Sequence, residues 1–182
     1  VREPIGLCGL SMGGYVALAF WHKYADRLRG LVLTDTRATA DIPEAAEKRL
    51  EMAVRVEREG PAPQVAAMRD LLFADATRAS QPELVTRVEK IMLATPGEGV
   101  AAAARGMAAR RDWSDRLGHI AVPTLVICGA HDVITPPDEM RRMAGAIPRA
   151  TYVELADAGH MANMEDSAGF NAALKKFLTA LD

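Results

Sequence analysis

The stretch GLCGLSMGGYVALAF, Gly6 to Phe20, joins two different patterns at a single serine. The apolar run over residues 4–10 predicts a short strand, and the apolar residues from Tyr15 onward recur at helical spacing. Ser11 lies between the two in a G-x-S-x-G motif, which is typical of a tight turn from a strand into a helix. Such a turn would hold the serine hydroxyl exposed above the edge of a sheet.

The glycines around Ser11 have steric roles in this interpretation. Side chains at Gly9 and Gly13 would collide with the neighbouring strand and helix, and Gly14 would let the helix lie close to the sheet. We also expect the N–H of Met12, at the positive end of the helix, to point to the position where an oxyanion would form.

Three more apolar runs predict further strands. They cover residues 29–36 (RGLVLTDT), 122–132 (VPTLVICGAHD) and 150–160 (ATYVELADAGH). Because helical patterns separate these runs, we expect an α/β fold with a parallel sheet of about four strands. A helix near residues 138–146 would lead to the last strand, and an amphipathic helix over residues 167–181 would follow it.

The segment from residue 41 to residue 112 interrupts this alternation with about four expected helices. The sequences SQPE (residues 80–83) and TPGE (residues 95–98) each fit a capping box with a proline just inside the helix. We therefore divide the chain into a core, residues 1–40 and 113–182, and an insertion, residues 41–112. The insertion is either a structural decoration or a lid over the C-terminal edge of the sheet, where open α/β folds bind ligands, and we favour the lid.

A serine hydroxyl becomes a good nucleophile only when a base accepts its proton, and the chain has 4 histidines. We expect His22, inside a helix, and His119, before a strand, to pack or to lie on the surface. A base at His131 would leave His160 without a role. His160 follows the last predicted strand, from where its side chain can reach Ser11, so it is the predicted base.

The carboxylate that orients this base is predicted to be Asp132, which follows the strand TLVICGA. The alternative role for Asp132 is to cap its own loop. Asp35, at the end of LVLTD, is a competing candidate because it also ends a strand. Asp157 and Glu165 flank the histidine segment and are expected to serve loop and helix termini. Serine, aspartate and histidine in this chain order occur in one of three unrelated folds that carry the triad.

Composition excludes several classes of function. The 182 residues carry a net charge of −2, and the 22 basic residues are interleaved with 24 acidic ones, so we expect no nucleic-acid partner. No apolar run reaches the roughly 18 residues that a membrane span requires. The two cysteines do not make a disulfide framework, which indicates a reducing, cytoplasmic location.

Three segments resemble the nucleophile, acid and histidine segments of the α/β-hydrolase superfamily: GLSMGGYVALAF, VPTLVICGAHDVITPP and ELADAGHMANMED. The resemblance covers essentially the whole chain and is nearest to esterases and lactonases similar to 3-oxoadipate enol-lactonase, which carry a helical cap. It implies Ser11 as nucleophile, Asp132 as orienting acid, His160 as general base and the N–H of Met12 as one oxyanion donor.

The family's strand order also implies where the cysteines lie. Cys8 and Cys128 would lie on strands separated by one other strand, about 9–10 Å apart at about 4.8 Å per strand. That separation is too large for a disulfide, so both are interpreted as small buried hydrophobic residues.

The chain begins with Val1 and departs from the family pattern at this end. The family's earlier strands, and the loop with a His-Gly pattern that supplies the second oxyanion N–H, are not found in it. We expect a partial α/β-hydrolase fold with a bare strand at one sheet edge. Loss of one oxyanion donor costs about 10²–10³ in rate, so the polypeptide alone should be poorly active, or be completed by an N-terminal segment or by homo-oligomerisation.

These patterns together predict a serine hydrolase for a small ester or lactone that works through an acyl-enzyme, with no metal or organic cofactor. For a carboxylate-bearing substrate, Arg105, Arg110 and Arg111 are candidate cations, with solvated surface arginines as the simpler alternative. Trp113 either lines the pocket or packs. Thioesterases, carbon–carbon bond hydrolases and perhydrolases or haloperoxidases share this machinery. A non-catalytic binding module is the alternative from another class.

Overall fold

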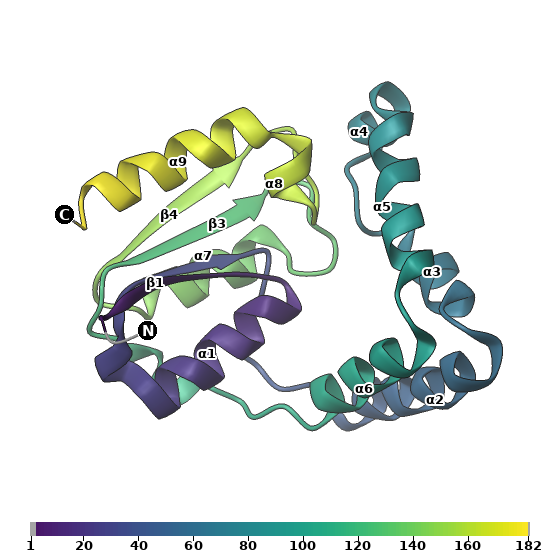
Figure 1. The fold of residues 1–182 in the computed structure, drawn as a ribbon. Helices are drawn as coiled ribbons and strands as arrows, with labels where there is room; N and C mark the ends of the chain where they lie inside the picture. The colour runs from purple at the N-terminus through teal and green to yellow at the C-terminus, as the bar shows by residue number, and fades with distance from the viewer. Residues whose placement is uncertain (1–2, 182) are drawn as a thin grey trace.

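The computed structural model describes residues 3–181 and contains a parallel sheet of four strands (Figure 1). The strands are β1 (Ile5–Leu10), β2 (Leu28–Thr34), β3 (Thr124–Gly129) and β4 (Ala150–Leu155), and they lie in this order across the sheet. Each neighbouring pair is parallel. The predicted α/β class and parallel sheet are therefore confirmed.

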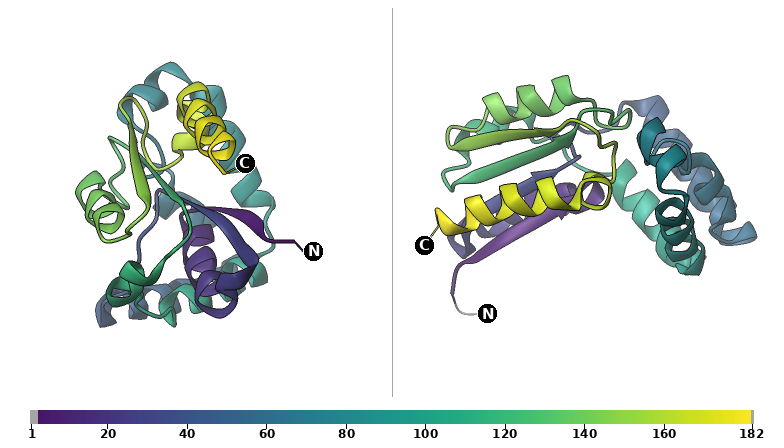
Figure 2. Two further views of the ribbon diagram at one scale, coloured as in Figure 1. Left: turned by 90° about the vertical axis from the view of Figure 1, so that its left-hand side faces the viewer. Right: turned by 90° about the horizontal axis from the view of Figure 1, so that it is seen from above.

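Helices cover both faces of the sheet (Figure 2). Helices α1 (Met12–Tyr24) and α7 (Pro137–Gly145) share one apolar core with the sheet, and α9 (Ser167–Thr179) packs on the other face, where Phe170 is buried against β2 and β3. Three short elements complete the core: η1 (Ala25–Arg27), η2 (Ser114–His119) and α8 (Ala162–Glu165). None of the helices in the described part of the chain is long and apolar enough to cross a membrane.

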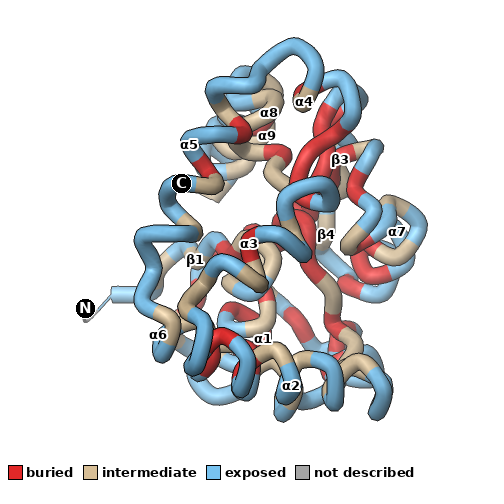
Figure 3. The backbone as a smooth tube through the Cα atoms, turned by 90° about the vertical axis from the view of Figure 1, so that its right-hand side faces the viewer, coloured by how far each residue is buried: buried red, intermediate tan, exposed pale blue. Residues whose placement is uncertain are grey.

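Five helices, where about four were expected, form a helical insertion between β2 and β3. They are α2 (Pro43–Glu59), α3 (Ala62–Met68), α4 (Asp75–Ser80), α5 (Pro82–Ala94) and α6 (Gly97–Ala108). The insertion stands beyond the C-terminal ends of the strands (Figures 1 and 2). Much of its outward surface is exposed, in contrast to the largely buried β3 (Figure 3).

The two predicted capping boxes are wrong. Ser80 ends α4 and donates its hydroxyl to the carbonyl of Ala76 at 2.7 Å, and the hydroxyl of Thr95 donates to the carbonyl of Ile91 at 3.0 Å. The helices follow one another so closely that both hydroxyls bond back to the preceding helix. Helices α5 and α6 therefore begin without a side-chain cap.

Two linkers join the insertion to the core, and they lie side by side. The N–H of Trp113 donates to the carbonyl of Ala38 at 2.9 Å, and Asp112 accepts the N–H of Ala40 at 3.1 Å. Arg110 forms an ion pair with Asp41 at 2.7 Å, and both side chains are buried. Burial alone would raise the pKa of Asp41, but the hydrogen bonds from Arg110 and Arg49 hold it below its usual value.

Both cysteines are free, as expected, but only one of them is buried. Cys128 lies inside β3, whereas Cys8 is exposed on β1. The expectation that Cys8 is buried is wrong for residues 3–181. Cys8 is in register with Val32 and faces the α9 side of the sheet, and within the described residues α9 packs mainly over β3 and β4 and leaves this face of β1 uncovered.

The turn around Ser11 is packed as expected at two of its three glycines. A Cβ at Gly9 would overlap the carbonyl of Gly13, and a Cβ at Gly14 would overlap the side chain of Thr36. A Cβ at Gly13 would meet nothing within 4 Å among the described residues, so the expected collision there is wrong.

This difference gives a matched pair of variants. Gly9→Ala should lower the free energy of unfolding by about 1–3 kcal/mol, because overpacking forces the backbone apart at the turn. Gly13→Ala should leave it unchanged or raise it by up to about 1 kcal/mol, because alanine favours the helix. Urea unfolding of both variants measures the difference, and equal destabilisation would contradict the packing described for Gly9.

Candidate active site

Ser11 occupies the turn between β1 and α1 with a φ of 51°, a left-handed conformation that is rare for residues other than glycine. Its N–H donates to the carbonyl of Thr34 at 2.8 Å. Its own carbonyl accepts hydrogen bonds from the N–H of Gly14 at 2.9 Å and from the hydroxyl of Thr36 at 2.7 Å. These three bonds fix the turn against the end of β2 and the start of α1.

The structure brings together the three residues predicted to react. The Nε2 atom of His160 lies 2.7 Å from the Oγ atom of Ser11, and its Nδ1 atom lies 2.8 Å from Oδ2 of Asp132. Ser11 follows β1, Asp132 follows β3 and His160 follows β4, so parallel strands deliver all three to one edge of the sheet. The His160 side chain is only 2% exposed, which leaves this chain of hydrogen bonds largely shielded from water.

Asp132 is held as a hydrogen-bond acceptor by its own loop. Its Oδ1 atom accepts the N–H groups of Ile134 and Thr135 at 2.8 and 2.9 Å, and its Oδ2 atom also accepts the hydroxyl of Thr135. Burial alone would raise the pKa of Asp132, but the hydrogen bond and charge of His160 and the bonds from Thr135 hold it below its usual value. An anionic Asp132 accepts the proton on Nδ1 of His160, which leaves Nε2 free to accept the proton of Ser11.

The competing acid, Asp35, has a different environment. It ends β2 with a φ of 43°, is fully buried, and accepts the N–H of Gly129 at 2.8 Å instead of bonding to His160. Burial raises the pKa of Asp35 to about 8; the bond from Gly129 opposes this shift, and the charge of Asp132 adds to it. Asp35 is therefore mostly uncharged at neutral pH, beside an ionised Asp132.

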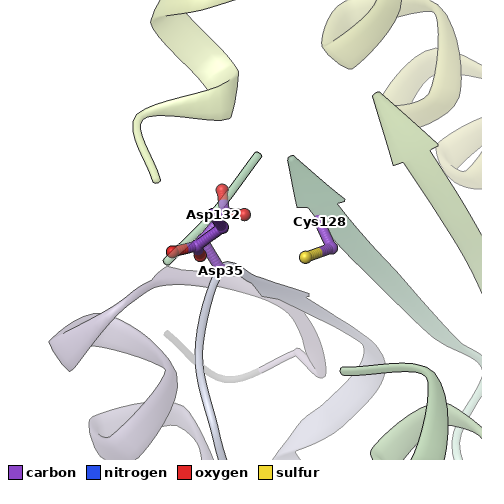
Figure 4. A group of neighbouring side chains, drawn as sticks. All are labelled: Asp35, Cys128 and Asp132. Carbon is purple, nitrogen blue, oxygen red and sulfur yellow. The ribbon is translucent and has the colours of Figure 1, made fainter. Parts of the chain in front are cut away.

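Asp35, Asp132 and Cys128 lie close together, with their potential ligand atoms within 4.8 Å of one another (Figure 4). A metal ion requires deprotonated ligands. Burial, followed by the charges of the two aspartates, raises the pKa of the Cys128 thiol above its usual value, and Asp35 is mostly protonated. Asp132 already accepts hydrogen bonds on both oxygens. We therefore interpret this cluster as supporting the loop that carries Asp132.

Two hollows adjoin Met12, the residue after the serine. A cavity of about 610 Å³ lies between Met12 and the insertion; its lining is mostly apolar, with polar groups at Lys48, Arg49 and Gln64. Its apolar lining includes Met52, Met68, Leu71, Val100 and Met107. A second groove, of about 440 Å³, runs between α1 and α6. Both hollows give access to the N-terminal end of α1.

The four residues expected near a substrate lie in different places. Arg105 forms an ion pair with Glu57 at 2.7 Å and lines neither of these hollows. Arg110, Arg111 and Trp113 all line the groove beside Met12.

Each of the three groove residues Arg110, Arg111 and Trp113 already contacts another side chain. Arg110 stacks on Tyr15 at 4.5 Å in addition to its ion pair with Asp41. Arg111 lies over the ring of Trp113 at 5.0 Å, and Trp113 packs against His22 at 4.5 Å. His22 was expected to pack or to lie on the surface; it is exposed and contacts Trp113 with its ring.

Glu165 makes a contact that the sequence did not reveal. It was expected to serve a loop or helix terminus, and its Oε1 atom does accept the N–H groups of Gly159 and Met161 at 2.9 and 3.1 Å. Its Oε2 atom accepts the N–H of Ala74, in the helical insertion, at 2.8 Å. These partners are 91 residues apart, and nothing in the pattern of either segment indicates the pairing.

Proteins similar to this chain include enol-lactonases and an esterase. The chain is 28% identical to 3-oxoadipate enol-lactonase 1 of Acinetobacter baylyi over 179 residues, which cover 98% of the chain and 65% of that relative. It is similar in structure to a thermophilic esterase from Thermogutta terrifontis, solved with malate bound, with a TM-score of 0.97 and 46% identity over 98% of this chain and 66% of that one. The enol-lactonase of Burkholderia xenovorans gives a TM-score of 0.87 and 33% identity over 97% of this chain and 66% of that one.

The chain thus spans about 65% of the length of the first of these relatives. A family model described as the alpha/beta hydrolase fold matches residues 2–167, which is most of the sequence. The turn at Ser11 and the parallel sheet behind it agree with that match. The chain belongs to the α/β-hydrolase fold family.

Proposed function

We propose that this chain carries the reacting residues of a serine hydrolase that cleaves small esters or lactones through an acyl-enzyme. The observation that supports this proposal most directly is the hydrogen-bonded series Ser11–His160–Asp132 at the C-terminal edge of the sheet. A binding protein needs no base within 2.7 Å of a serine hydroxyl, nor a buried carboxylate behind that base.

In the proposed reaction, Ser11 Oγ attacks the substrate carbonyl while Nε2 of His160 accepts its proton. Asp132 stabilises the imidazolium that forms and keeps the ring in the productive orientation. His160 then gives the proton to the leaving oxygen, which releases the alcohol and leaves an acyl group on Ser11. Water attacks this ester with His160 again acting as the base, and the serine is regenerated.

The N–H of Met12 is the proposed oxyanion donor within this chain. Met12 is the first residue of α1, so its amide belongs to the turn whose N–H groups lack helical acceptors and whose dipole favours negative charge. Each such donor contributes about 10²–10³ in rate.

The proposed substrate site is the cavity of about 610 Å³ beside Met12, with the helical insertion acting as its cap. Its apolar lining suits the hydrocarbon part of an ester or lactone. Lys48 adds a positive charge to the lining, whereas Arg49, also in the lining, is paired with Asp41. The similarity to an esterase and to enol-lactonases supports this substrate class.

We further propose that a strand from outside the described residues pairs with β1 and brings a second oxyanion donor. The outer edge of β1 has no partner within residues 3–181, and Cys8 on this strand is exposed. An open apolar edge of this kind favours pairing with another strand. An exposed thiol at Cys8 also fits a reducing compartment such as the cytoplasm.

A fluorophosphonate probe tests the proposed nucleophile. The probe should label the chain at a single site, and Ser11→Ala should abolish labelling because no other hydroxyl has His160 as its base. Labelling is measured by intact-protein mass spectrometry. A chain that includes the completing strand and still does not react would favour the binding-module alternative.

The choice of acid is tested by two matched substitutions. Asp132→Asn should lower kcat about 10⁴-fold, because the amide cannot hold the productive tautomer of His160. Asp35→Asn should keep activity within about tenfold, because asparagine can still accept the N–H of Gly129. Ester hydrolysis by both variants decides the assignment, and the reverse ranking would make Asp35 the acid.

The Asp35 variant has its own signature in stability. In the parent sequence, Asp35 loses its proton near pH 3.8 when the chain is unfolded and near pH 8 when it is folded. The free energy of unfolding therefore falls as the pH rises between these values. Asp35→Asn removes this loss. Its free energy of unfolding relative to the parent should therefore increase from about pH 4 to about pH 8 and then level off, as measured by urea unfolding across this range.

The proposed completing strand predicts low turnover by the 182-residue polypeptide alone. With one oxyanion donor, its hydrolysis of p-nitrophenyl acetate should be about 10²–10³-fold slower than that of a form in which β1 is paired. Steady-state assays, with sedimentation to establish the oligomeric state, measure this. An isolated monomer with ordinary esterase rates would contradict the completion proposal and leave the triad proposal intact.

A further inference from the structure

Glu165 joins the loop that carries His160 to the helical insertion. One carboxylate oxygen accepts the N–H groups on either side of the histidine, from Gly159 at 2.9 Å and Met161 at 3.1 Å. The other oxygen accepts the N–H of Ala74 at 2.8 Å. A single side chain therefore bonds both the loop of the proposed base and a segment that lies between α3 and α4.

The same two segments also touch directly. The N–H of Met161 donates to the carbonyl of Leu72 at 3.1 Å. A Cβ at Gly159 would overlap the backbone of Phe73 and Ala74, so the loop backbone lies against the insertion backbone. Residues 72–74 are all buried at this contact.

An apolar cluster surrounds these bonds and extends to the acid loop. Leu72 and Phe73 of the insertion pack in one cluster with Met161, which directly follows His160, with Met164, and with Ile134, two residues after Asp132. The insertion thus contributes to the packing of both loops that orient the proposed base.

We propose that Glu165 is a positioning residue for His160 and that it makes the alignment of this base depend on residues 72–74 of the insertion. The inference rests on the proposed hydrolase function. Glu165 touches no reacting atom; it fixes the backbone on both sides of His160, and through Ala74 it transmits the position of the insertion to that backbone.

The geometry explains why the link matters for the reaction. His160 must hold hydrogen bonds of 2.7 and 2.8 Å to two residues from other strands at the same time. A misplacement of about 1 Å in such an arrangement can cost about 10²-fold in rate. Only a carboxylate accepts all three N–H groups, because one end of a glutamine amide is a donor.

Glu165→Gln is the first test. It should lower kcat about 10- to 100-fold with KM changed less than about twofold, because the substrate cavity is untouched while the base is misaligned. A second readout needs no substrate: proton NMR of the Nδ1–H of His160, whose hydrogen bond to Asp132 should give a sharp downfield signal in the parent. That signal should broaden or disappear in Glu165→Gln.

Ala74→Pro tests the link from the insertion side. It removes the N–H that Glu165 accepts, at a residue whose φ of −59° proline also adopts, and it places a ring carbon where that hydrogen met the carboxylate. It should reproduce the loss of kcat and the change in the His160 signal. If Ala74→Pro leaves both unchanged while Glu165→Gln alters them, the proposed dependence on the insertion is wrong.

Asp166→Asn is the matched control. Asp166 is the next carboxylate in the chain and caps α9 by accepting the N–H of Gly169 at 2.9 Å, without a bond to the His160 loop. It should change thermal stability little, because asparagine also accepts the N–H of Gly169, and it should leave kcat and the His160 signal at parent values. If Glu165→Gln leaves kcat and the His160 signal unchanged like this control, Glu165 does not position His160 and the proposal fails.

The two readouts separate this proposal from the hydrolase proposal. If the parent polypeptide, complete with its β1 partner, neither reacts with fluorophosphonate nor hydrolyses esters, the proposed function fails, and the NMR signal alone still decides whether Glu165 aligns His160. If the parent is active and both Glu165→Gln and Ala74→Pro match it in kcat and in the signal, only the positioning role is overturned.

Discussion

The left-handed backbone of Ser11 is the constraint on which the site depends. L-residues avoid this conformation, and here it is held by three hydrogen bonds, two of which come from the residues that end and follow β2. If the serine relaxed to an ordinary helical or extended conformation, its hydroxyl would turn away from His160 and its carbonyl would lose Thr36. The pairing of β1 with β2 is therefore as important for the proposed nucleophile as the motif that contains it.

Hydrogen bonding gives two buried aspartates, both of which follow strands, different charges. Asp132 has four hydrogen-bond donors, including His160, and remains an anion in a nearly closed site. Asp35 is fully buried beside an anionic neighbour, and its backbone donors, among them the N–H of Gly129, do not offset this burial, so it retains its proton to about pH 8. Two carboxylates so close together at one sheet edge are tolerated because only one of them is charged at neutral pH.

The sequence predicted the parts of this arrangement that depend on local pattern. The G-x-S-x-G turn, the apolar strands and the positions of Asp132 and His160 after strands follow from short stretches, and the parallel order then brings them together. Glu165 and Thr36 could not be assigned their partners, because these contacts join segments that only the folded chain brings together. The capping boxes failed because a motif does not specify which of two adjoining helices its hydroxyl will bond to.

The two linkers of the helical insertion, residues 38–41 and 110–113, bond to each other, so the two ends of the insertion are held together. The entropic cost of closing a loop rises only with the logarithm of its length, so such a segment can be exchanged for a longer or shorter one while the sheet stays unchanged. If the insertion is the cap of the proposed hydrolase, new substrate preferences can evolve by exchange of this segment alone. The contact with Glu165 sets the condition on such an exchange, since any replacement has to present a backbone N–H where Ala74 now does.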